Sequence, residues 1–312
     1  MRATAVGARE ARGSPVKPRL GLVGLGNIGE PMCRHLLDGG YEVAVYDVNP
    51  ESVSRLGDTP AEPVENLKAL AAGADVVLLS LPNSDIVEEV VLGEDGLAGG
   101  LSAGKVLIDT SSSRPSSTRR IAERLEADEV DMLDAPVSGG VLRAREGKLS
   151  VMVGGERAVF DRCSNILQAF GGQIFFVGDH GTGHLVKALN NLLSATTLAS
   201  AAEATILAQK AGVSPDLFIE VLNASNGRSY STEVKFPQYI LNRAFDDGFA
   251  VGLMSKDLKI ALDTAMELGF PMLIGSTLAQ IWQAAVTQGY EAEGHTAIYA
   301  FLENLLGERE GE

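Results

Sequence analysis

The strongest constraint on the fold is a change of sequence pattern near Gly183. Before this point, from Arg19 to about Val177, short β-branched runs alternate with longer helical patterns, and after it the strand pattern stops. The predicted strands are Leu20–Val23, Val43–Tyr46, Val76–Leu79, Val106–Asp109 and Met132–Ala135. Alternating strands and helices form a parallel sheet with helices on both faces. We therefore predict an α/β fold, with a doubly wound parallel sheet over residues 19–182 and an all-helical domain over residues 183–312.

A long predicted helix joins the two domains. The stretch His184–Ala211 contains neither Gly nor Pro across 28 residues, which corresponds to a helix of roughly 40 Å. Its apolar residues lie around most of the circumference: Leu185, Val186, Ala188, Leu189, Leu192, Leu193, Leu198, Ala201 and Ala202. Such a helix must be buried on nearly every side. Because the helical domain is small, we expect a second subunit to cover part of it, in a homodimer or a homotetramer.

The acidic composition of the chain argues against two classes of partner. The 312 residues carry a formal net charge of −15 and an isoelectric point near 4.8. Nucleic acid and anionic membrane surfaces are bound by concentrated Lys and Arg side chains, so neither is an expected partner. In addition, no apolar run of the sequence approaches the roughly 20 residues that span a bilayer.

The cysteines and the N-terminal residues give weaker indications. Cys33 and Cys163 are the two cysteines, and neither has a second Cys or a His at metal-ligand spacing. We therefore expect reduced thiols, a cytoplasmic location and no metal site. Residues 1–18 hold four basic residues against one acidic residue and are interrupted by Gly and Pro. A flexible tail is the expectation, and an organellar targeting peptide is the alternative.

A glycine-rich turn follows the first predicted strand. Gly24, Gly26 and Gly29 have the spacing of a phosphate-binding turn, and a helix is predicted to begin there. The first glycine permits the tight turn, the second lets a pyrophosphate approach the backbone, and the third allows the helix to pack closely on the strand. Together with Asn27 and Ile28, these residues predict a dinucleotide site in a Rossmann-like sheet.

An acidic residue at the end of the next strand strengthens this prediction. Asp47 comes 18 residues after Gly29, close to the spacing at which a carboxylate accepts hydrogen bonds from the ribose hydroxyls. A carboxylate there repels the 2′-phosphate of NADP, and Val48 and Asn49 supply no cation to hold that phosphate. We therefore expect NAD as the cofactor, with NADP less favoured. The alternative is that Asp47 merely ends the strand in a turn.

Two further stretches carry candidate chemistry. Ser138 is followed by Gly139 and Gly140, which place a hydroxyl beside consecutive backbone N–H groups and could grip a carboxylate. At the start of the long helix, Lys187 and Asn191 are four residues apart and share a face. Burial and the positive end of the helix dipole both favour a neutral lysine, which suits a general acid or base. The alternatives are a glycine-rich turn without a ligand and a lysine that points to the solvent.

These three stretches, in this order and followed by Leu253-Met-Ser-Lys256-Asp257-Leu258, resemble the β-hydroxyacid dehydrogenase family, and within it the 3-hydroxyisobutyrate dehydrogenases. The resemblance covers the chain from Arg19 to about Leu306. It implies that the chain transfers a hydride between NAD and a small 3-hydroxy acid, or reduces the matching semialdehyde.

The resemblance also implies roles for individual residues. Lys187 is the general acid/base, Asn191 is its hydrogen-bonding partner near the reacting oxygen, and Ser138 holds the substrate carboxylate together with the two glycines after it. The residues implied along the cofactor are Leu81, Pro82, Ser112, Phe249, Lys256 and Asp257. In the oxidation, neutral Lys187 accepts the hydroxyl proton, and in the reverse reaction it acts as the acid.

The chain departs from this family between Asn226 and Lys235. Relatives have a Trp and a Tyr where this chain has Tyr230 and Lys235. We therefore expect both residues to line a more polar substrate pocket, with Arg228 as a further cation, so that 3-hydroxyisobutyrate itself need not be the substrate. The alternative is that the charged residues simply point to water.

Three alternative functions fit the sequence less well than a 3-hydroxy acid dehydrogenase. One is an NADPH-dependent imine or semialdehyde reductase of the same superfamily. Imine reductases usually have another residue where Lys187 stands and favour NADPH, so Lys187 and Asp47 both argue against an imine reductase. A non-catalytic dinucleotide-binding scaffold of the same fold typically lacks the lysine. A 6-phosphogluconate dehydrogenase is a longer chain and is not expected.

Overall fold

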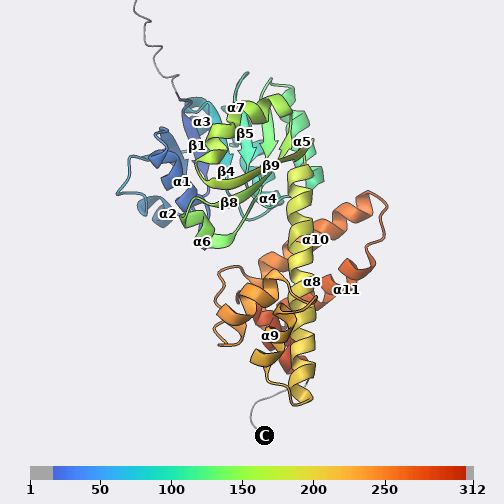
Figure 1. Cartoon of the computed structure of the whole chain (residues 1–312). Helices are drawn as coiled ribbons and strands as arrows, with labels where there is room; N and C mark the ends of the chain where they lie inside the picture. The colour runs from blue at the N-terminus through green and yellow to red at the C-terminus, as the bar shows by residue number, and fades with distance from the viewer. Residues whose placement is uncertain (1–16, 307–312) are drawn as a thin grey trace, which may run out of the picture.

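The computed structural model describes residues 17–306 (Figure 1). Within these residues, nine strands form one sheet. The strands are β1 (Leu20–Val23), β2 (Val43–Tyr46), β3 (Glu62–Pro63), β4 (Val76–Leu79), β5 (Val106–Asp109), β6 (Asp131–Asp134), β7 (Val137–Ser138), β8 (Leu149–Gly155) and β9 (Gly171–Gly178). The five predicted strands correspond to β1, β2, β4, β5 and β6. Of the expected tail, only Lys17 and Pro18 lie within the described residues.

The first six strands form the predicted parallel sheet. Their order is β3-β2-β1-β4-β5-β6, and each neighbouring pair is parallel. β1 and β4 are buried along their whole length, as expected for apolar strands with helices on both faces. The chain winds from β1 towards one edge and then from β4 towards the other. Ligands of such sheets bind at this switch point, beside the carboxyl ends of the strands.

The sheet continues past β6 with a change of direction. β8 pairs antiparallel with β6 and with β7, whereas β9 pairs parallel with β8. These three strands and β3 lie outside the predicted strands, because β3 and β7 have two residues each and β8 ends in Gly154 and Gly155, which weaken a strand pattern. The expectation of a parallel sheet is therefore correct for six strands and incomplete at this end.

Helices cover both faces of the sheet (Figure 1). They are α1 (Gly29–Asp38), α2 (Pro50–Ser54), α3 (Leu67–Gly73), α4 (Ser84–Leu92), η1 (Leu97–Gly99), α5 (Pro115–Glu126), α6 (Gly140–Arg145) and α7 (Arg157–Gln168). Successive side chains of a strand point to opposite faces, so Leu22 belongs to one apolar core and Val23 to the other. Two separate cores therefore hold the sheet in place.

The second domain is helical and is built around α8 (Thr182–Lys210), which leads out of the sheet (Figure 1). The other elements are α9 (Pro215–Asn223), the π-helix η2 (Ser231–Ile240), α10 (Val251–Glu267), α11 (Leu273–Ala285), η3 (Val286–Tyr290), η4 (His295–Ala297) and α12 (Ile298–Leu305). Leu198, Phe236 and Trp282 belong to the core that they share with α8. Among residues 17–306, no helix has the length and apolar character needed to cross a membrane.

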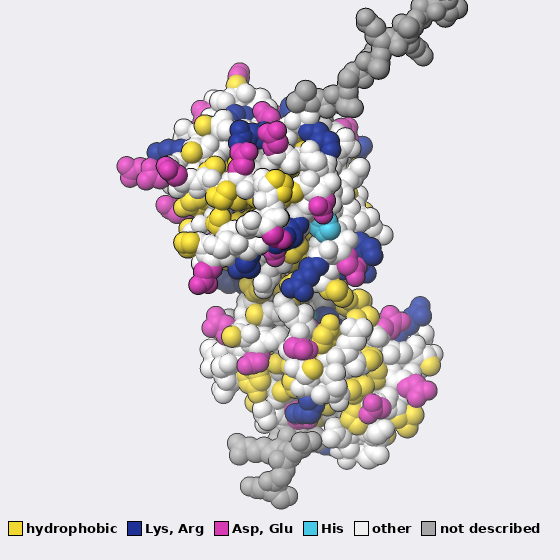
Figure 2. Space-filling view, turned by 90° about the vertical axis from the view of Figure 1, so that its left-hand side faces the viewer, with side chains coloured by type: hydrophobic (Ala, Val, Ile, Leu, Met, Phe, Trp, Pro, Cys, Tyr) yellow, Lys and Arg dark blue, Asp and Glu magenta, His cyan; other side chains and the backbone are white. Residues whose placement is uncertain are grey.

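One stripe of α8 is exposed, contrary to the expectation that the helix is buried on nearly every side. Leu192, Leu198 and Ala202 are buried, but Leu193 is 65% exposed and Leu207 is 68% exposed. The other helices of the domain cover only part of the circumference, so the prediction is wrong for this stripe within one chain. Figure 2 shows that other hydrophobic side chains also reach the surface of this domain.

Asp134, the last residue of β6, fixes the start of α8 to the sheet. Its carboxylate is buried; Oδ1 accepts a hydrogen bond from the backbone N–H of Gly181 at 2.8 Å, and Oδ2 accepts one from His184 at 3.0 Å. These N–H groups would otherwise lack partners, because the first turn of a helix has none of its own. Gly183 permits this close approach, since an added Cβ would lie 2.4 Å from the carbonyl oxygen of Met152.

We expect Asp134→Ala to lower the free energy of unfolding by about 2–4 kcal/mol, because it leaves two buried N–H groups without acceptors. Asp134→Asn keeps one acceptor oxygen and should lose less. The control is Asp128→Ala, which removes an exposed ion pair with Arg124 and should change stability by less than about 0.5 kcal/mol. Urea unfolding measures all three, and an Asp134→Ala variant as stable as the control would contradict the role of this carboxylate.

Candidate active site

The predicted glycine turn lies at the carboxyl end of β1, at the switch point of the sheet. Gly24 has a φ of +93°, and a Cβ there would lie 2.2 Å from the carbonyl oxygen of Ser80. A Cβ on Gly29 would lie 2.0 Å from the carbonyl oxygen of Gly24, so neither position tolerates a side chain. A Cβ on Gly26 would meet no atom within 4 Å. The space beside Gly26 is therefore open, as the approach of a pyrophosphate requires.

The helix α1 begins directly after this turn. Asn27 is exposed, and Ile28 packs partly against the core beneath the helix. The first N–H groups of a helix and its dipole favour an anion at this end. The turn and the helix together fit the pyrophosphate of a dinucleotide.

Asp47 lies beside the turn, at the end of β2. Its Oδ2 accepts a hydrogen bond from the N–H of Leu25 at 2.7 Å, and its Oδ1 accepts one from Asn49 at 2.8 Å. Val48 is 86% exposed. On the same turn, Nη2 of Arg55 donates to the carbonyl oxygen of Leu25 at 2.6 Å. The sequence analysis considered only the two residues after Asp47 and missed this cation.

Lys256 connects the helical domain to the loops after β4 and β5. Its Nζ donates to the carbonyl oxygen of Pro82 at 3.1 Å and to that of Ser112 at 3.2 Å. The two loops are joined to each other, because the N–H of Leu81 donates to Oγ of Ser111 at 2.9 Å. The structure therefore brings four of the predicted cofactor residues together, namely Leu81, Pro82, Ser112 and Lys256.

Lys187 and Asn191 are both buried, and a chain of contacts joins them to Lys256. Nζ of Lys187 donates to Oδ1 of Asn191 at 3.4 Å, and Nδ2 of Asn191 donates to Oδ2 of Asp257 at 2.6 Å. The other oxygen of Asp257 lies 3.1 Å from Nζ of Lys256. The predicted catalytic pair is therefore linked, through one ion pair, to the loops at the carboxyl ends of the strands.

Burial is the main cause that lowers the pKa of Lys187. The positive charge of Lys256 lowers this pKa further, and the negative charge of Asp257 opposes both effects. The sequence analysis placed Lys187 in the first turn, but α8 begins at Thr182, so Lys187 stands in the second turn. The helix dipole acts mainly within the first turn, and burial therefore carries the shift.

Ser138 and the two glycines after it lie at the surface, between β7 and α6. Ser138 pairs with Ser150 of β8. Gly139 and Gly140 are exposed and have φ values of +133° and +69°. A Cβ on Gly140 would meet no atom within 4 Å, whereas one on Gly139 would lie 2.8 Å from the side chain of Arg143. The helix α6 lies close to the helical domain, since a Cβ on Gly248 would be 3.9 Å from Val141. The turn therefore faces the boundary between the two domains.

The segment that departs from the family is only partly buried. Tyr230 is 62% exposed and Arg228 is exposed, so the structure does not bring either of them into the site. Lys235 is buried, and its Nζ donates to Oγ of Ser194 at 2.9 Å. Phe249 packs edge-on against His295, with ring centroids 5.6 Å apart. Of these residues, Lys235 is the one that reaches the face of α8 that carries Lys187.

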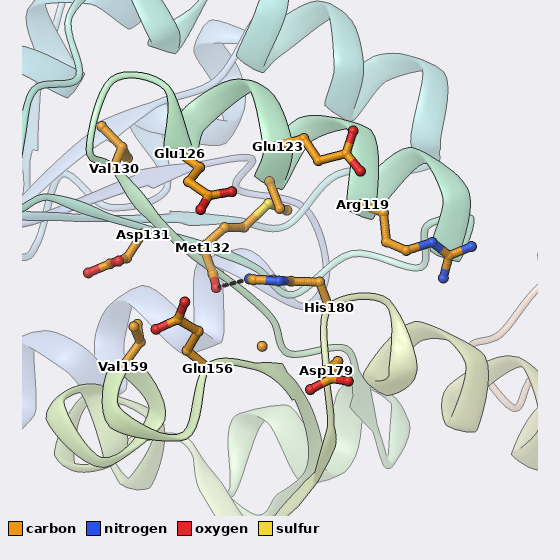
Figure 3. Close-up of a pocket in the computed structure, with 12 residues that line it drawn as sticks. Arg119, Glu123, Glu126, Val130, Asp131, Met132, Glu156, Val159, Asp179 and His180 are labelled. Atoms are coloured by element: carbon orange, nitrogen blue, oxygen red, sulfur yellow. Dashed lines mark hydrogen bonds between the residues drawn. The ribbon is translucent and has the colours of Figure 1, made fainter.

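Two cavities lie away from these residues. One, of about 410 Å³, is bordered by α5, β6, α7 and the start of α8 (Figure 3). Five of its twelve lining residues are acidic, and His180 bonds across it to the carbonyl oxygen of Met132 at 3.0 Å. The other, of about 500 Å³, lies between α10 and α11. Neither lining includes a predicted site residue. Within residues 17–306, no group of His, Cys, Asp and Glu side chains is arranged to hold a metal ion.

The sequence analysis missed two residues beside the predicted catalytic pair. His184 is buried, and its ring lies 2.7 Å from Oγ1 of Thr118 and 3.2 Å from the carbonyl oxygen of Ser111. Ser194 is the partner of Lys235. Helical periodicity could have indicated Ser194, because it follows Lys187 by seven residues and so lies on the same stripe.

Comparison with known proteins defines the family of this chain. Residues 19–178 match the NAD binding domain of 6-phosphogluconate dehydrogenase, and residues 181–302 match the NAD-binding domain of NADP-dependent 3-hydroxyisobutyrate dehydrogenase. The chain is 37% identical to the 2-(hydroxymethyl)glutarate dehydrogenase of Eubacterium barkeri, over 93% of this chain and 96% of that one. It is 36% identical to the 3-hydroxyisobutyrate dehydrogenase of Pseudomonas aeruginosa, over 88% and 94% of the two chains.

A solved structure supports the same assignment. The 3-hydroxyisobutyrate dehydrogenase of Mycobacterium tuberculosis, solved with L-serine, superposes with a TM-score of 0.86 at 29% identity, over 92% of this chain and 99% of that one. The fold and the site define a dinucleotide-binding oxidoreductase of hydroxy acids. The chain belongs to the β-hydroxyacid dehydrogenase family and is 3-hydroxyisobutyrate dehydrogenase-like. An imine reductase of Streptomyces aurantiacus is 20% identical with a TM-score of 0.61, which shows a shared fold alone.

Proposed function

We propose that this chain is an NAD-dependent dehydrogenase of small 3-hydroxy acids, with Lys187 as its general acid/base. The observation that carries the proposal is a buried lysine bonded to Asn191, beside an ion pair that contacts the cofactor loops. The relatives named above are dehydrogenases of 3-hydroxyisobutyrate and of 2-(hydroxymethyl)glutarate. A hydroxy acid of this size, or the matching semialdehyde, is therefore the substrate class.

Proton transfer falls to Nζ of Lys187. Burial favours its neutral amine, which accepts the proton of the substrate hydroxyl in the oxidation and returns it in the reduction. Asn191 orients this amine, because it accepts from Lys187 and donates to Asp257. When bound, the nicotinamide cofactor supplies the hydride acceptor. A non-catalytic scaffold would have no use for a buried lysine whose charge is disfavoured, which argues against that alternative.

The remaining roles follow from position. Residues 19–182 bind the cofactor through the glycine turn and Asp47, and residues 183–312 serve substrate binding and assembly. Ser138 and the backbone N–H groups of Gly139 and Gly140 bind the substrate carboxylate. Asp47 favours NAD, since its fixed carboxylate would face the 2′-phosphate of NADP.

We also propose a cytoplasmic location, in which Cys33 and Cys163, both buried free thiols, stay reduced.

We expect Lys187→Met to lower kcat by roughly 10²- to 10⁴-fold, because the reaction loses its general acid/base. Binding of NADH, followed by fluorescence, should persist. The variant should also melt at a higher temperature, because an apolar side chain replaces a buried ionisable group. In the wild type, the oxidation rate should rise with pH as Lys187 loses its proton, at a pH below the ordinary lysine range, and this rise should vanish in the variant.

The matched control for this prediction is Lys148→Met. This lysine is exposed on the sheet domain and pairs with Glu146, so its loss should leave kcat and the pH profile unchanged. A Lys187→Met variant with the turnover of this control would refute the proposed role of Lys187.

The cofactor preference predicts the effect of Asp47→Ser combined with Val48→Arg. The double variant removes the repelling carboxylate and adds a cation, so the ratio of kcat/KM for NAD to that for NADP should fall by at least about tenfold. Val48→Arg alone keeps the carboxylate and should change the ratio far less. Equal use of the two cofactors by the wild type would show that Asp47 does not select between them, with Arg55 as the next residue to vary.

We further propose that the exposed stripe of α8 is covered by a second copy of the chain. Sedimentation at micromolar concentration should then show a species larger than the 32.8 kDa monomer. Leu193→Glu places a charge on the exposed stripe of α8 and should shift the protein towards the monomer. Val48→Glu, at an exposed apolar residue of the other domain, should not. A wild type that sediments only as a monomer is incompatible with this proposal.

A further inference from the structure

Lys235 presents a buried ammonium group that its own chain leaves largely unpaired. The residue is only 6% exposed, and Nζ has one hydrogen-bond partner, Oγ of Ser194 at 2.9 Å. Among residues 17–306, no carboxylate lies within ion-pair distance, 4 Å, of this Nζ. An ammonium has three donors, and burying an unpaired charge is costly. A structural role would not require a charge here.

The nearest acidic group is already occupied. Oδ1 of Asp247 accepts hydrogen bonds from the N–H of Phe249 at 3.1 Å and from the ring of His295, while Oδ2 accepts from the N–H of Thr296 at 2.9 Å. Burial lowers the pKa of Lys235 to about 8, and the charge of Asp247 only partly opposes this effect. Asp247 therefore does not neutralise Lys235.

Lys235 reaches the same face of α8 as the proposed general acid/base. Its partner Ser194 lies seven residues after Lys187 and three after Asn191, so all three stand on one stripe of the helix. Residues three apart on a helix have their Cβ atoms roughly 5–6 Å from each other. One ammonium is bonded to Asn191 and the other to Ser194. The two amines therefore contact residues that lie three apart on one stripe of α8.

We propose that Lys235, held in place by Ser194, binds a second carboxylate of the substrate, so that the enzyme acts on hydroxy acids with a carboxylate at each end. This inference rests on the proposed dehydrogenase function. The reacting hydroxyl lies at Lys187, the first carboxylate lies at the turn after Ser138, and the second one pairs with Lys235. The helix α6, which follows that turn, lies beside the loop of Asp247 and Gly248.

The test compares two substrates that differ at one end only. 2-(Hydroxymethyl)glutarate carries the second carboxylate, and 2-(hydroxymethyl)pentanoate has a methyl group in its place. The wild type should prefer the diacid in kcat/KM by roughly ten- to a hundredfold, as expected for a charge-assisted hydrogen bond. Lys235→Met should abolish this preference, mainly through KM, because the contact is equally strong before and during the reaction.

Two further variants separate charge from packing. Lys235→Gln can still donate to Ser194 but has no charge, so it should lose the preference as Lys235→Met does. It also decides the question if Lys235→Met does not fold by circular dichroism. Lys259→Met removes an exposed lysine on α10 that pairs with Asp263, and it should keep the preference of the wild type. An unchanged ratio in both Lys235 variants, or a wild type that prefers the monoacid, overturns the proposal.

A binding measurement keeps this proposal distinct from the proposed function. Glutarate has two carboxylates and no hydroxyl, so it cannot be oxidised by this reaction. In the presence of NADH it should raise the melting temperature of the wild type and of Lys259→Met, but not of the Lys235 variants, and butyrate should raise none of them. If no hydroxy acid is oxidised while glutarate still stabilises through Lys235, the dehydrogenase function fails and the carboxylate site stands. If glutarate stabilises all variants equally, the carboxylate site is refuted.

Discussion

The position of α8 depends on one buried carboxylate. Asp134 belongs to the sheet, and both of its oxygens accept hydrogen bonds from the backbone at the start of α8. The glycine turn and Asp47 are fixed by the sheet, whereas Lys187 and Asn191 are fixed by the helix. The distance between the glycine turn and the proposed proton-transfer pair is therefore set by this cap. Small displacements between reacting groups cost large factors in rate, which explains why a rigid, fully buried acceptor holds the junction.

A second set of contacts, made by α10, also holds the helical domain against the sheet domain. Lys256 on α10 binds the carbonyl oxygens of the loops after β4 and β5, and Asp257, the next residue, binds Asn191. Neighbouring residues of a helix point about 100° apart, so one can face the sheet while the other faces α8. The cap by Asp134 and the pair on α10 thus both join the two domains, and Ser116 on α5 adds a hydrogen bond to Glu267 at the end of α10. The face of α8 that carries Lys187 and Asn191 lies close to both contacts.

The local parts of the site could be predicted from the sequence, and the long-range parts could not. The turn at Gly24 and the carboxylate of Asp47 follow adjacent parallel strands, and the carboxyl ends of such strands meet at one edge of the sheet. The pairing of Lys187 with Asn191 follows from helical periodicity. By contrast, Lys235 and Ser194 are 41 residues apart, and no local pattern reports such a contact. Likewise, β8 reverses direction through pairing with β6, which depends on packing rather than on its own residues.

The charges of the buried groups indicate where an anionic substrate belongs. Asp134 is satisfied by backbone N–H groups, and Asp109 is satisfied by Ser111 and Ser113. Within residues 17–306, the hydrogen bonds of Lys187 and Lys235 go only to neutral side-chain oxygens. The fold therefore completes the pairing of these acids by itself. Burial favours the neutral form of Lys187, so Lys235 is the cation that a substrate would pair with.

The net negative charge of the protein means that an anionic substrate must be attracted by cations close to the site. A net charge of −15 repels an anionic substrate at long range, and this repulsion is screened by salt over roughly 10 Å. Figure 2 shows Lys and Arg side chains on the surface where the molecule narrows between its domains. A buried cation such as Lys235 attracts an anion much more strongly than a cation in water does. The burial of Lys235 without a counter-ion lowers the stability of the free protein, as is common for groups at functional sites. A substrate with two carboxylates would bring one to the Ser138 turn and one to Lys235. The second carboxylate would be the counter-ion that Lys235 lacks within residues 17–306.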